Sequence, residues 1–247
     1  MIRLFTVWFD ANNPGRQAEV RECVERNLIN PAIGQVNLWH YSGPVPFNDS
    51  KIKLHPAMDR PTFSELFALA NRICAPSDIA IVANTDIWFD DTIALVQGMP
   101  ANVIYALLRY EKNGRPYSSE TGPAWHSQDS WIFCPPIRVK DVDFKLGMPR
   151  CDNALAYRFW RAGYNLQNPA LTIRSHHVHP SKLRVYHDTK DRVVRPWMHI
   201  EPTELGQPGE MRVSPPKLLQ FLGWRTVMPD AHGQRNPIGD QAQLKWR

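Results

Sequence analysis

Two pairs of polar residues have the types and the spacing to hold a metal ion. Asn84 and Asp86 follow the apolar run Ile79–Ala83, and His177 and His179 follow the last expected strand. Side chains two residues apart in an extended chain point to the same face, so each pair can present its atoms together. A carboxylate with a second oxygen ligand suits a hard divalent cation bound to a phosphate, and Mn²⁺ also accepts imidazole. The alternatives are an ordinary turn for the first pair and a histidine-rich loop closing a sheet edge for the second.

The apolar run Ile79–Ala83 is the element that positions the first pair. Its side chains are apolar or small without alternation, which is typical of a strand covered on both faces. In open α/β sheets, ligands bind at the carboxyl ends of such strands, where the first pair lies. Asp90 and Asp91 follow closely, and we interpret them as caps of a short helix over residues 92–97, without a role in chemistry.

Strand and helix patterns alternate up to about residue 180. Thr62 begins a helix, and Glu65 three residues later completes the signature of a capping box. The first strand, helix and second strand form a βαβ unit, which implies parallel pairing. The other expected elements are strands over 3–9, 36–41, 102–110 and 168–174, and helices over 15–29 and 152–162. Within residues 125–133, polar residues are expected to precede a short apolar strand.

The chain of 247 residues is long enough for one large α/β domain with an appendage. From Pro180 onward the pattern weakens into Pro-rich pieces with one expected helix near residues 216–223. We therefore expect a main domain over residues 1–180 and a Pro-rich, basic appendage over residues 181–247 that packs on it. The appendage contains 11 Lys and Arg against 7 Asp and Glu, which is most of the net charge of +5. An acidic partner is expected to meet this part, and an ordinary solvated surface is the alternative.

The cysteines and the apolar segments bear on the cellular compartment. The four cysteines form no CxxC pair, which favours reduced thiols in a cytoplasmic protein. No apolar run of about 18 residues is present to span a membrane. The N-terminus lacks the apolar core and the cleavage site of a signal peptide. We expect a cytoplasmic protein without a transmembrane segment.

The order of the elements and several motifs resemble the GT-A glycosyltransferases. The likeness covers about residues 2–180 and implies a GT-A-like, Rossmann-like α/β fold with a mixed, mainly parallel sheet flanked by helices. It implies transfer of a sugar from a nucleotide-diphosphate sugar, with UDP as the expected nucleotide, to an acceptor hydroxyl. In that family a DxD motif holds Mn²⁺ or Mg²⁺ on the diphosphate, and here Asn84 replaces its first Asp, which removes one charge from the site. The motifs that carry the likeness are Arg60-Pro-Thr-Phe-Ser-Glu-Leu-Phe, Ile81-Val-Ala-Asn-Thr-Asp-Ile-Trp-Phe-Asp, Ser127-Gln-Asp-Ser-Trp-Ile-Phe, Pro149-Arg-Cys-Asp-Asn and His177-Val-His179.

The resemblance also implies roles for two carboxylates and the histidine pair. Asp152, at the start of an expected helix, would be the general base of an inverting reaction, taking the proton of the acceptor hydroxyl. Its alternative role is a helix cap. Asp129 would contact the donor sugar or the acceptor, or else satisfy backbone amides at the start of a strand. Either His177 or His179 would supply the metal-binding histidine that GT-A enzymes often place after the last core strand.

Four further residues would lie around the nucleotide. Thr6, Phe9 and Asp10, at the end of the first strand, would flank the base if the fold is as implied. Arg60 could pair with a phosphate or stack on the base, because its planar guanidinium suits both, and a structural ion pair is its alternative.

Other functions remain open from the sequence. The acceptor is not identified, and a basic appendage with Trp197, Trp224 and Trp246 also suits a glycosyltransferase that acts on hydroxylated bases in DNA. The loss of the first DxD carboxylate suits a degenerate protein that binds a sugar nucleotide or nucleic acid without turnover. Nucleotidyl transfer lacks a glycine-rich loop after the first strand, and a hydrolase built on the histidines has only Asp188 and Asp191 nearby.

Overall fold

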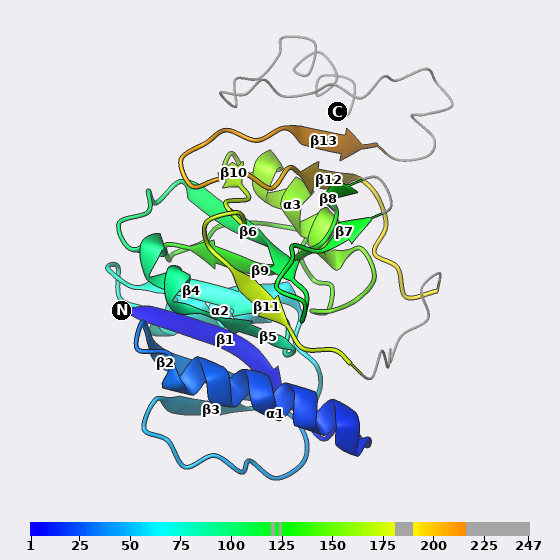
Figure 1. Cartoon of the computed structure of the whole chain (residues 1–247). Helices are drawn as coiled ribbons and strands as arrows, with labels where there is room; N and C mark the ends of the chain where they lie inside the picture. Colours follow the sequence, from blue (N-terminus) through cyan, green and yellow to red (C-terminus); the bar gives the residue numbers. More distant parts are fainter. Residues whose placement is uncertain (120–121, 124, 181–189, 216–247) are drawn as a thin grey trace.

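The computed structural model describes residues 1–119, 122–123, 125–180 and 190–215. A large sheet curls between two layers of helices, with the N-terminal elements at one end and the last hairpin at the other (Figure 1). The helices are α1 (Pro14–Ile29), α2 (Phe63–Ile73), the short 3₁₀ helix η1 (Asp91–Val96) and α3 (Cys151–Arg161). The strands are β1 (Ile2–Trp8), β2 (Ile33–His40), β3 (Ile52–Pro56), β4 (Ile79–Ala83), β5 (Ile87–Phe89), β6 (Val103–Tyr110), β7 (Ser118–Ser119), β8 (Gly122–Pro123), β9 (Gln128–Phe133), β10 (Asn165–Gln167), β11 (Ser175–His177), β12 (Trp197–Ile200) and β13 (Met211–Ser214).

The main sheet has nine strands in the order β3-β2-β1-β4-β9-β6-β11-β5, with β10 paired to β6. β1 runs parallel to both β2 and β4, as the βαβ pattern predicted. β9 lies between β4 and β6 and is antiparallel to both. The polar start of β9 therefore reaches the edge where the parallel strands end. The predicted α/β fold with a mixed, mainly parallel sheet is confirmed.

Strand β4 is buried on both faces, which explains its continuous apolar sequence. Ala80 and Val82 belong to the core under α2 and α3, whereas Ile79, Ile81 and Ala83 belong to the core under α1 and η1. Side chains along a strand alternate between the faces, so each layer of helices receives its own set. This packing holds the end of β4 firmly at the carboxyl edge of the sheet.

Side-chain caps begin α1, α2 and η1, the last two where the sequence indicated. The Thr62 hydroxyl accepts the Glu65 N–H, and the Glu65 carboxylate accepts the Thr62 N–H, which completes the predicted capping box. Asn13 caps α1, with Pro14 in the first helical turn. Asp90 caps η1, as expected, by accepting the N–H of Thr92.

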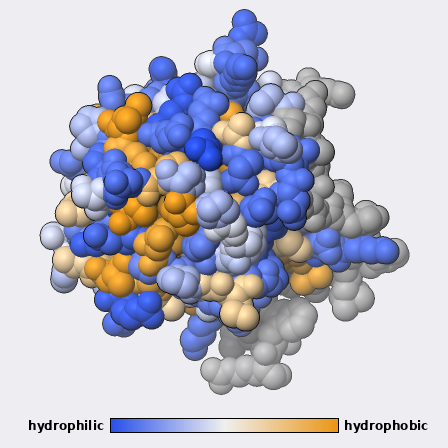
Figure 2. Space-filling model, turned by 90° about the horizontal axis from the view of Figure 1, so that it is seen from below, coloured by the Kyte–Doolittle hydropathy of each residue, from blue (hydrophilic) through white to orange (hydrophobic). Residues whose placement is uncertain are grey.

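Two segments differ from the sequence prediction. The edge strand β3 was not predicted, because it is half exposed and so lacks an apolar signature. The strand expected over 168–174 was wrong: N–H groups of Thr172 and Ile173 bond to the Pro169 carbonyl in a turn, and the strands β10 and β11 lie on either side. Figure 2 looks from below Figure 1, at the end of the molecule where β3 lies, and shows apolar side chains gathered between hydrophilic ones.

The hairpin β12–β13 packs on α3, and its residues Met198, Ile200 and Met211 are buried in the same core cluster as the helix (Figure 1). The boundary predicted at residue 180 stays a prediction, and the helix predicted near 216–223 lies outside the described residues. All four cysteines are free thiols. Among the described helices, none combines the length and the apolar character needed to cross a bilayer.

Candidate functional site

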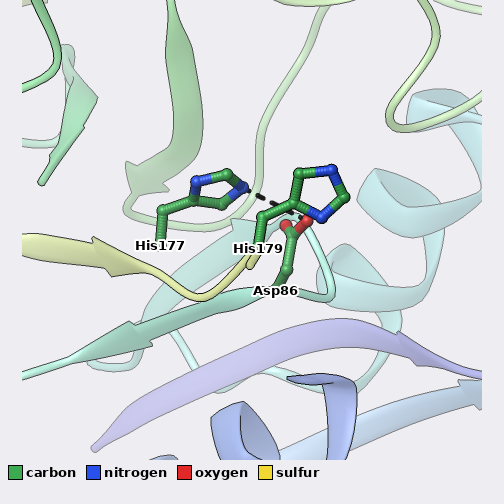
Figure 3. Close-up of side chains that lie close together, drawn as sticks. All are labelled: Asp86, His177 and His179. Carbon is green, nitrogen blue, oxygen red and sulfur yellow. Dashed lines mark ion pairs between the residues drawn. The ribbon is translucent and has the colours of Figure 1, made fainter. Parts of the chain in front are cut away.

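Asp86 and the histidine pair meet at the carboxyl edge of the sheet. Asp86 lies in the turn between β4 and β5, and β11 pairs with β5 so that His177 stands opposite Ile87. The His177 Nε2 atom is 3.4 Å from Asp86 Oδ2, and Figure 3 shows both imidazole rings beside the Asp86 carboxylate. Asp86, His177 and His179 each offer a ligand atom, and these atoms lie within 4.8 Å of one another. The structure therefore brings together Asp86, His177 and His179, but not Asn84.

One carboxylate and two imidazoles fit a first-row divalent cation such as Mn²⁺, which accepts both ligand types. The positively charged guanidinium of Arg16 already lies beside Asp86. Arg16, in the first turn of α1, donates from Nη2 to Asp86 Oδ2 at 2.8 Å and from Nη1 to His179 Nδ1 at 2.8 Å. Its Nη1 also donates to the buried Glu19 at 2.8 Å. The donor set fits a metal ion, and such an ion would compete with the Arg16 guanidinium for Asp86.

The charges at this edge are strongly coupled. Burial would raise the pKa of Asp86, but His177 and Arg16 outweigh it and hold the pKa far below its usual range. Burial also opposes the charged form of His177, yet Asp86 and Glu111 on its two sides raise its pKa to about 9. Glu111 has its pKa lowered to about 2, mainly by His177. At neutral pH, Asp86 and Glu111 are therefore ionised, and the protonated His177 lies between them.

Asn84 does not face Asp86, contrary to the expectation of an extended pair. The backbone turns at this point, because the Asn84 carbonyl accepts the N–H of Ile87. The Asn84 side chain instead donates from Nδ2 to Asp129 Oδ1 at 2.6 Å. Arg109 Nη1 donates to the other oxygen of Asp129 at 2.9 Å. The Asp129 carboxylate is thus held on both oxygens by side-chain donors rather than by backbone amides, and it lines a hollow together with Asp86.

Asp152 is in the first turn of α3, but it does not cap that helix. The N-cap position is Arg150, in the left-handed region with φ 66°, and no side chain caps the helix. Asp152 Oδ2 accepts the N–H of Gln128 at 3.3 Å, which ties the start of α3 to the start of β9. Burial and the charge of Asp129 raise the pKa of Asp152 to about 7. A carboxyl group with such a pKa exchanges a proton readily near neutral pH.

Two adjoining hollows hold these groups, and they share Asn84, Arg109, Asp129, Leu146 and Gly147. The hollow that contains Asp152 has a volume of about 160 Å³, and we name it the α3 hollow. The other has a volume of about 180 Å³, and we name it the α1 hollow; its lining includes Arg16, Asp86, His177, His179 and Arg60. Asp129 therefore stands between the candidate metal ligands and Asp152.

The residues predicted around the nucleotide separate into two groups. Phe9 and Arg60 line the α1 hollow, and Phe9 stacks on Tyr41 with ring centroids 5.4 Å apart. Thr6 is buried inside β1 and lines neither hollow. Asp10 is exposed beyond β1, where its backbone N–H bonds to Ser42, and it also lines neither hollow.

Sequence reasoning missed four charged residues of this site. Arg16 and Glu19 come from α1. Arg109 lies near the end of β6, Glu111 directly follows that strand, and Arg109 Nε donates to Glu111 at 2.8 Å. A signal was present in both elements. Glu19 lies on the buried face of α1 beside Val20, and Arg109 interrupts an otherwise apolar strand. Charged residues in such positions are rarely buried unless they are paired.

Comparison with known proteins adds evidence on the fold alone. No protein-family model matches the chain, and no curated protein matches its sequence. A crystal structure of GalNAc-T7 with UDP, GalNAc and Mn²⁺ is similar, with a TM-score of 0.50 at 10% identity, over 72% of this chain and 43% of that one. TarS 1–349 from S. aureus has a TM-score of 0.41 at 8% identity, over 72% of this chain and 57% of that one. HddC from Yersinia pseudotuberculosis has a TM-score of 0.30 at 11% identity, over 54% of this chain and 77% of that one.

The chain spans less than two thirds of the length of the first two structures. The fold assignment depends on the first of them, together with the sheet order and the position of the site at the carboxyl edge. The chain has the fold of the GT-A nucleotide-sugar glycosyltransferases.

Proposed function

We propose that the chain transfers a sugar from a nucleotide-diphosphate sugar, with UDP as the expected nucleotide, to an acceptor hydroxyl. The observation that carries this proposal is the pair of adjoining hollows. One holds a carboxylate and two imidazoles, and the other holds a carboxyl group whose pKa is near neutral, with Asp129 between them. This division suits a donor diphosphate in the α1 hollow and an acceptor in the α3 hollow. The catalytic part is then the main domain, with residues from 181 onward as its appendage.

On the donor side, Asp86, His177 and His179 would hold the divalent cation, Mn²⁺ or Mg²⁺. Such a cation supplies Lewis-acid stabilisation of the charge on a departing diphosphate. Arg16 would release Asp86 when the cation binds and would keep its bond to Glu19. Arg60 and Phe9 line the same hollow and would contact the nucleotide, Arg60 through its planar guanidinium.

On the acceptor side, Asp152 would be the general base. It takes the proton of the acceptor hydroxyl as that oxygen attacks the anomeric carbon from the face opposite the nucleotide, which inverts the configuration. Asp129, fixed by Asn84 and Arg109, would orient the sugar between the two hollows. Asp152 lies beyond the N-cap position of α3, lines the α3 hollow and bonds to the start of β9, which supports its catalytic role.

The test is hydrolysis and transfer of UDP-sugars with and without Mn²⁺, together with UDP binding by calorimetry. We expect Mn²⁺ to stimulate the release of UDP. The variant Asp152→Asn should transfer sugar at least about 100-fold more slowly, which is the smallest effect expected for removal of a general base. The same variant should still bind UDP. Binding of a sugar nucleotide without any turnover would favour the degenerate binding protein. The absence of both binding and turnover would refute the proposal, and a product with retained configuration would remove Asp152 as the base.

A further inference from the structure

Arginines gather beside the α3 hollow, around two tryptophans. The guanidinium carbons of Arg195, Arg150 and Arg192 lie 4.7, 5.2 and 5.9 Å from the ring centroid of Trp197. Arg212, on the neighbouring strand β13, lies 3.8 Å from the ring centroid of Trp125. We name these four arginines the arginine cluster. They come from the start of α3, from the segment before β12 and from β13, so the fold brings them together from distant parts of the chain.

The arginine cluster is continuous with the α3 hollow. Arg150 lines that hollow and precedes Asp152 by two residues. The N–H of Val193 bonds to the Pro149 carbonyl, and the N–H of Ile200 bonds to the Trp125 carbonyl, which anchor the hairpin segment beside the hollow. A chain whose hydroxyl reached Asp152 would therefore extend over the cluster.

Three members of the arginine cluster, Arg150, Arg195 and Arg212, keep most of their positive charge unpaired within the described residues. Within the described residues, Arg150 and Arg195 form no salt bridge, and Arg212 pairs only with Glu210 at 3.3 Å. Burial and the positive charges lower the pKa of two nearby histidines. Burial and the charges of His126, Arg150, Arg195 and Arg212 lower the pKa of His199 to about 4, and burial with Arg150 and Arg109 lowers the pKa of His126.

The positions of Trp197 and Trp125 indicate which kind of ligand group the arginine cluster binds. Trp197 is buried and already contacted by guanidinium groups, and Arg212 covers Trp125, so neither ring is free to stack on a base. The guanidinium groups themselves offer planar sets of N–H donors that match phosphate oxygens. Along β12, Trp197 and His199 are separated by about 7 Å, and Arg212 lies opposite His199 in the register. Arginines spread over such a length suit several phosphates in a row better than one.

We propose that the acceptor is a phosphodiester chain, and that Arg150, Arg195 and Arg212 bind its phosphates while its hydroxyl reaches Asp152. The inference deepens the proposed function, since the bound chain is an acceptor only if the protein transfers a sugar. Phosphate binding itself does not depend on the donor site, so it can be measured separately.

The experiment measures the affinity of the full chain for a fluorescent single-stranded dT12 oligonucleotide by anisotropy, from 50 to 200 mM NaCl. Three phosphate contacts on a single strand contribute a slope of about −2 in log K against log[salt], an affinity loss of about 20-fold over this range. The double variant Arg195→Gln/Arg212→Gln should shift the slope by about +1.4, because two contacts are lost. Inorganic polyphosphate as a competitor distinguishes the sources: equal competition per phosphate indicates any phosphate chain, and competition by DNA alone indicates nucleic acid.

Arg161→Gln is the matched control, since it removes one exposed positive charge about 16 Å further along α3. Its slope should equal that of the wild type. Any binding through residues 216–247 persists in all variants, so the difference in slope reports the cluster. A wild-type slope near zero, or a double variant that binds like the wild type, would overturn the proposal. UDP-sugar hydrolysis uses no phosphate chain, and its failure would be a failure of the proposed function alone.

Discussion

Asp152→Asn should remove catalysis and at the same time stabilise the protein above neutral pH. The unfolded chain loses the proton of Asp152 near pH 3.8, whereas the folded protein keeps this proton up to about pH 7. Between these values the folded state binds more protons than the unfolded state, so stability falls as the pH rises, and the loss is complete above pH 7. Asparagine has the same shape, can still accept the N–H of Gln128 and carries no charge.

The size of the effect follows from the pKa difference. A rise from 3.8 to about 7 corresponds to roughly 4 kcal/mol, at 1.36 kcal/mol per pKa unit. Asp152 keeps partial access to water, which screens its charge, so we expect a gain of about 2–4 kcal/mol for the variant at pH 8. For a domain of this size that corresponds to an increase of roughly 5–15 °C in the melting temperature.

Thermal unfolding followed by circular dichroism, at pH 4 and pH 8, provides the assay. The variant should melt like the wild type at pH 4 and well above it at pH 8. Asp143→Asn, which changes an exposed carboxylate, is the control and should show no such pH dependence. Equal melting differences at both pH values, or a less stable variant at pH 8, would refute the assignment of a raised pKa to Asp152.

Three further predictions follow from the same structure. Turnover should rise with pH through about 7, because Asp152 accepts a proton only when it is ionised, and a rate that stays flat from pH 6 to 8.5 would contradict this role. Arg16→Met should tighten Mn²⁺ binding, measured by electron paramagnetic resonance, about tenfold or more, since the competing charged hydrogen bond to Asp86 contributes about 1.5–3 kcal/mol. Unchanged or weaker binding would show that Arg16 does not compete. Thr62→Ala should lower the stability in urea by about 1 kcal/mol, because it removes the capping box of α2, and an unchanged midpoint would contradict that contribution.

The sequence predicts well what depends on local chemistry. The apolar run before Asp86 predicts a strand covered on both faces, and Thr62 with Glu65 predicts the start of α2. The spacing of His177 and His179 predicts that both face the same site, which is where they lie. In each case the deciding interaction is made by residues within a few positions of one another or by the burial of a whole strand.

The contacts that the sequence does not predict depend on the order of strands in the sheet. Asn84 turns toward Asp129 because β9 lies between β4 and β6, and no local pattern specifies that insertion. Arg16 reaches Asp86 across 70 positions of the chain because α1 packs beside β5. Such pairings are set by the global packing of elements. The secondary-structure propensity and the residue spacing within one segment do not predict them.

The antiparallel direction of β9 has a consequence for how this scaffold can be altered. Because β6 ends and β9 begins at the same edge, the connection over residues 111–127 departs from and returns to the rim beside Asp129. A change in the length of a surface connection costs little free energy, since each doubling adds only about 0.6 kcal/mol. The part of this connection between Glu111 and Trp125 is therefore suited to grafting. Exchanging it alters what the rim admits, while the paired strands on which Asp86 and Asp129 depend stay in register and the contacts of Glu111 and Trp125 are kept.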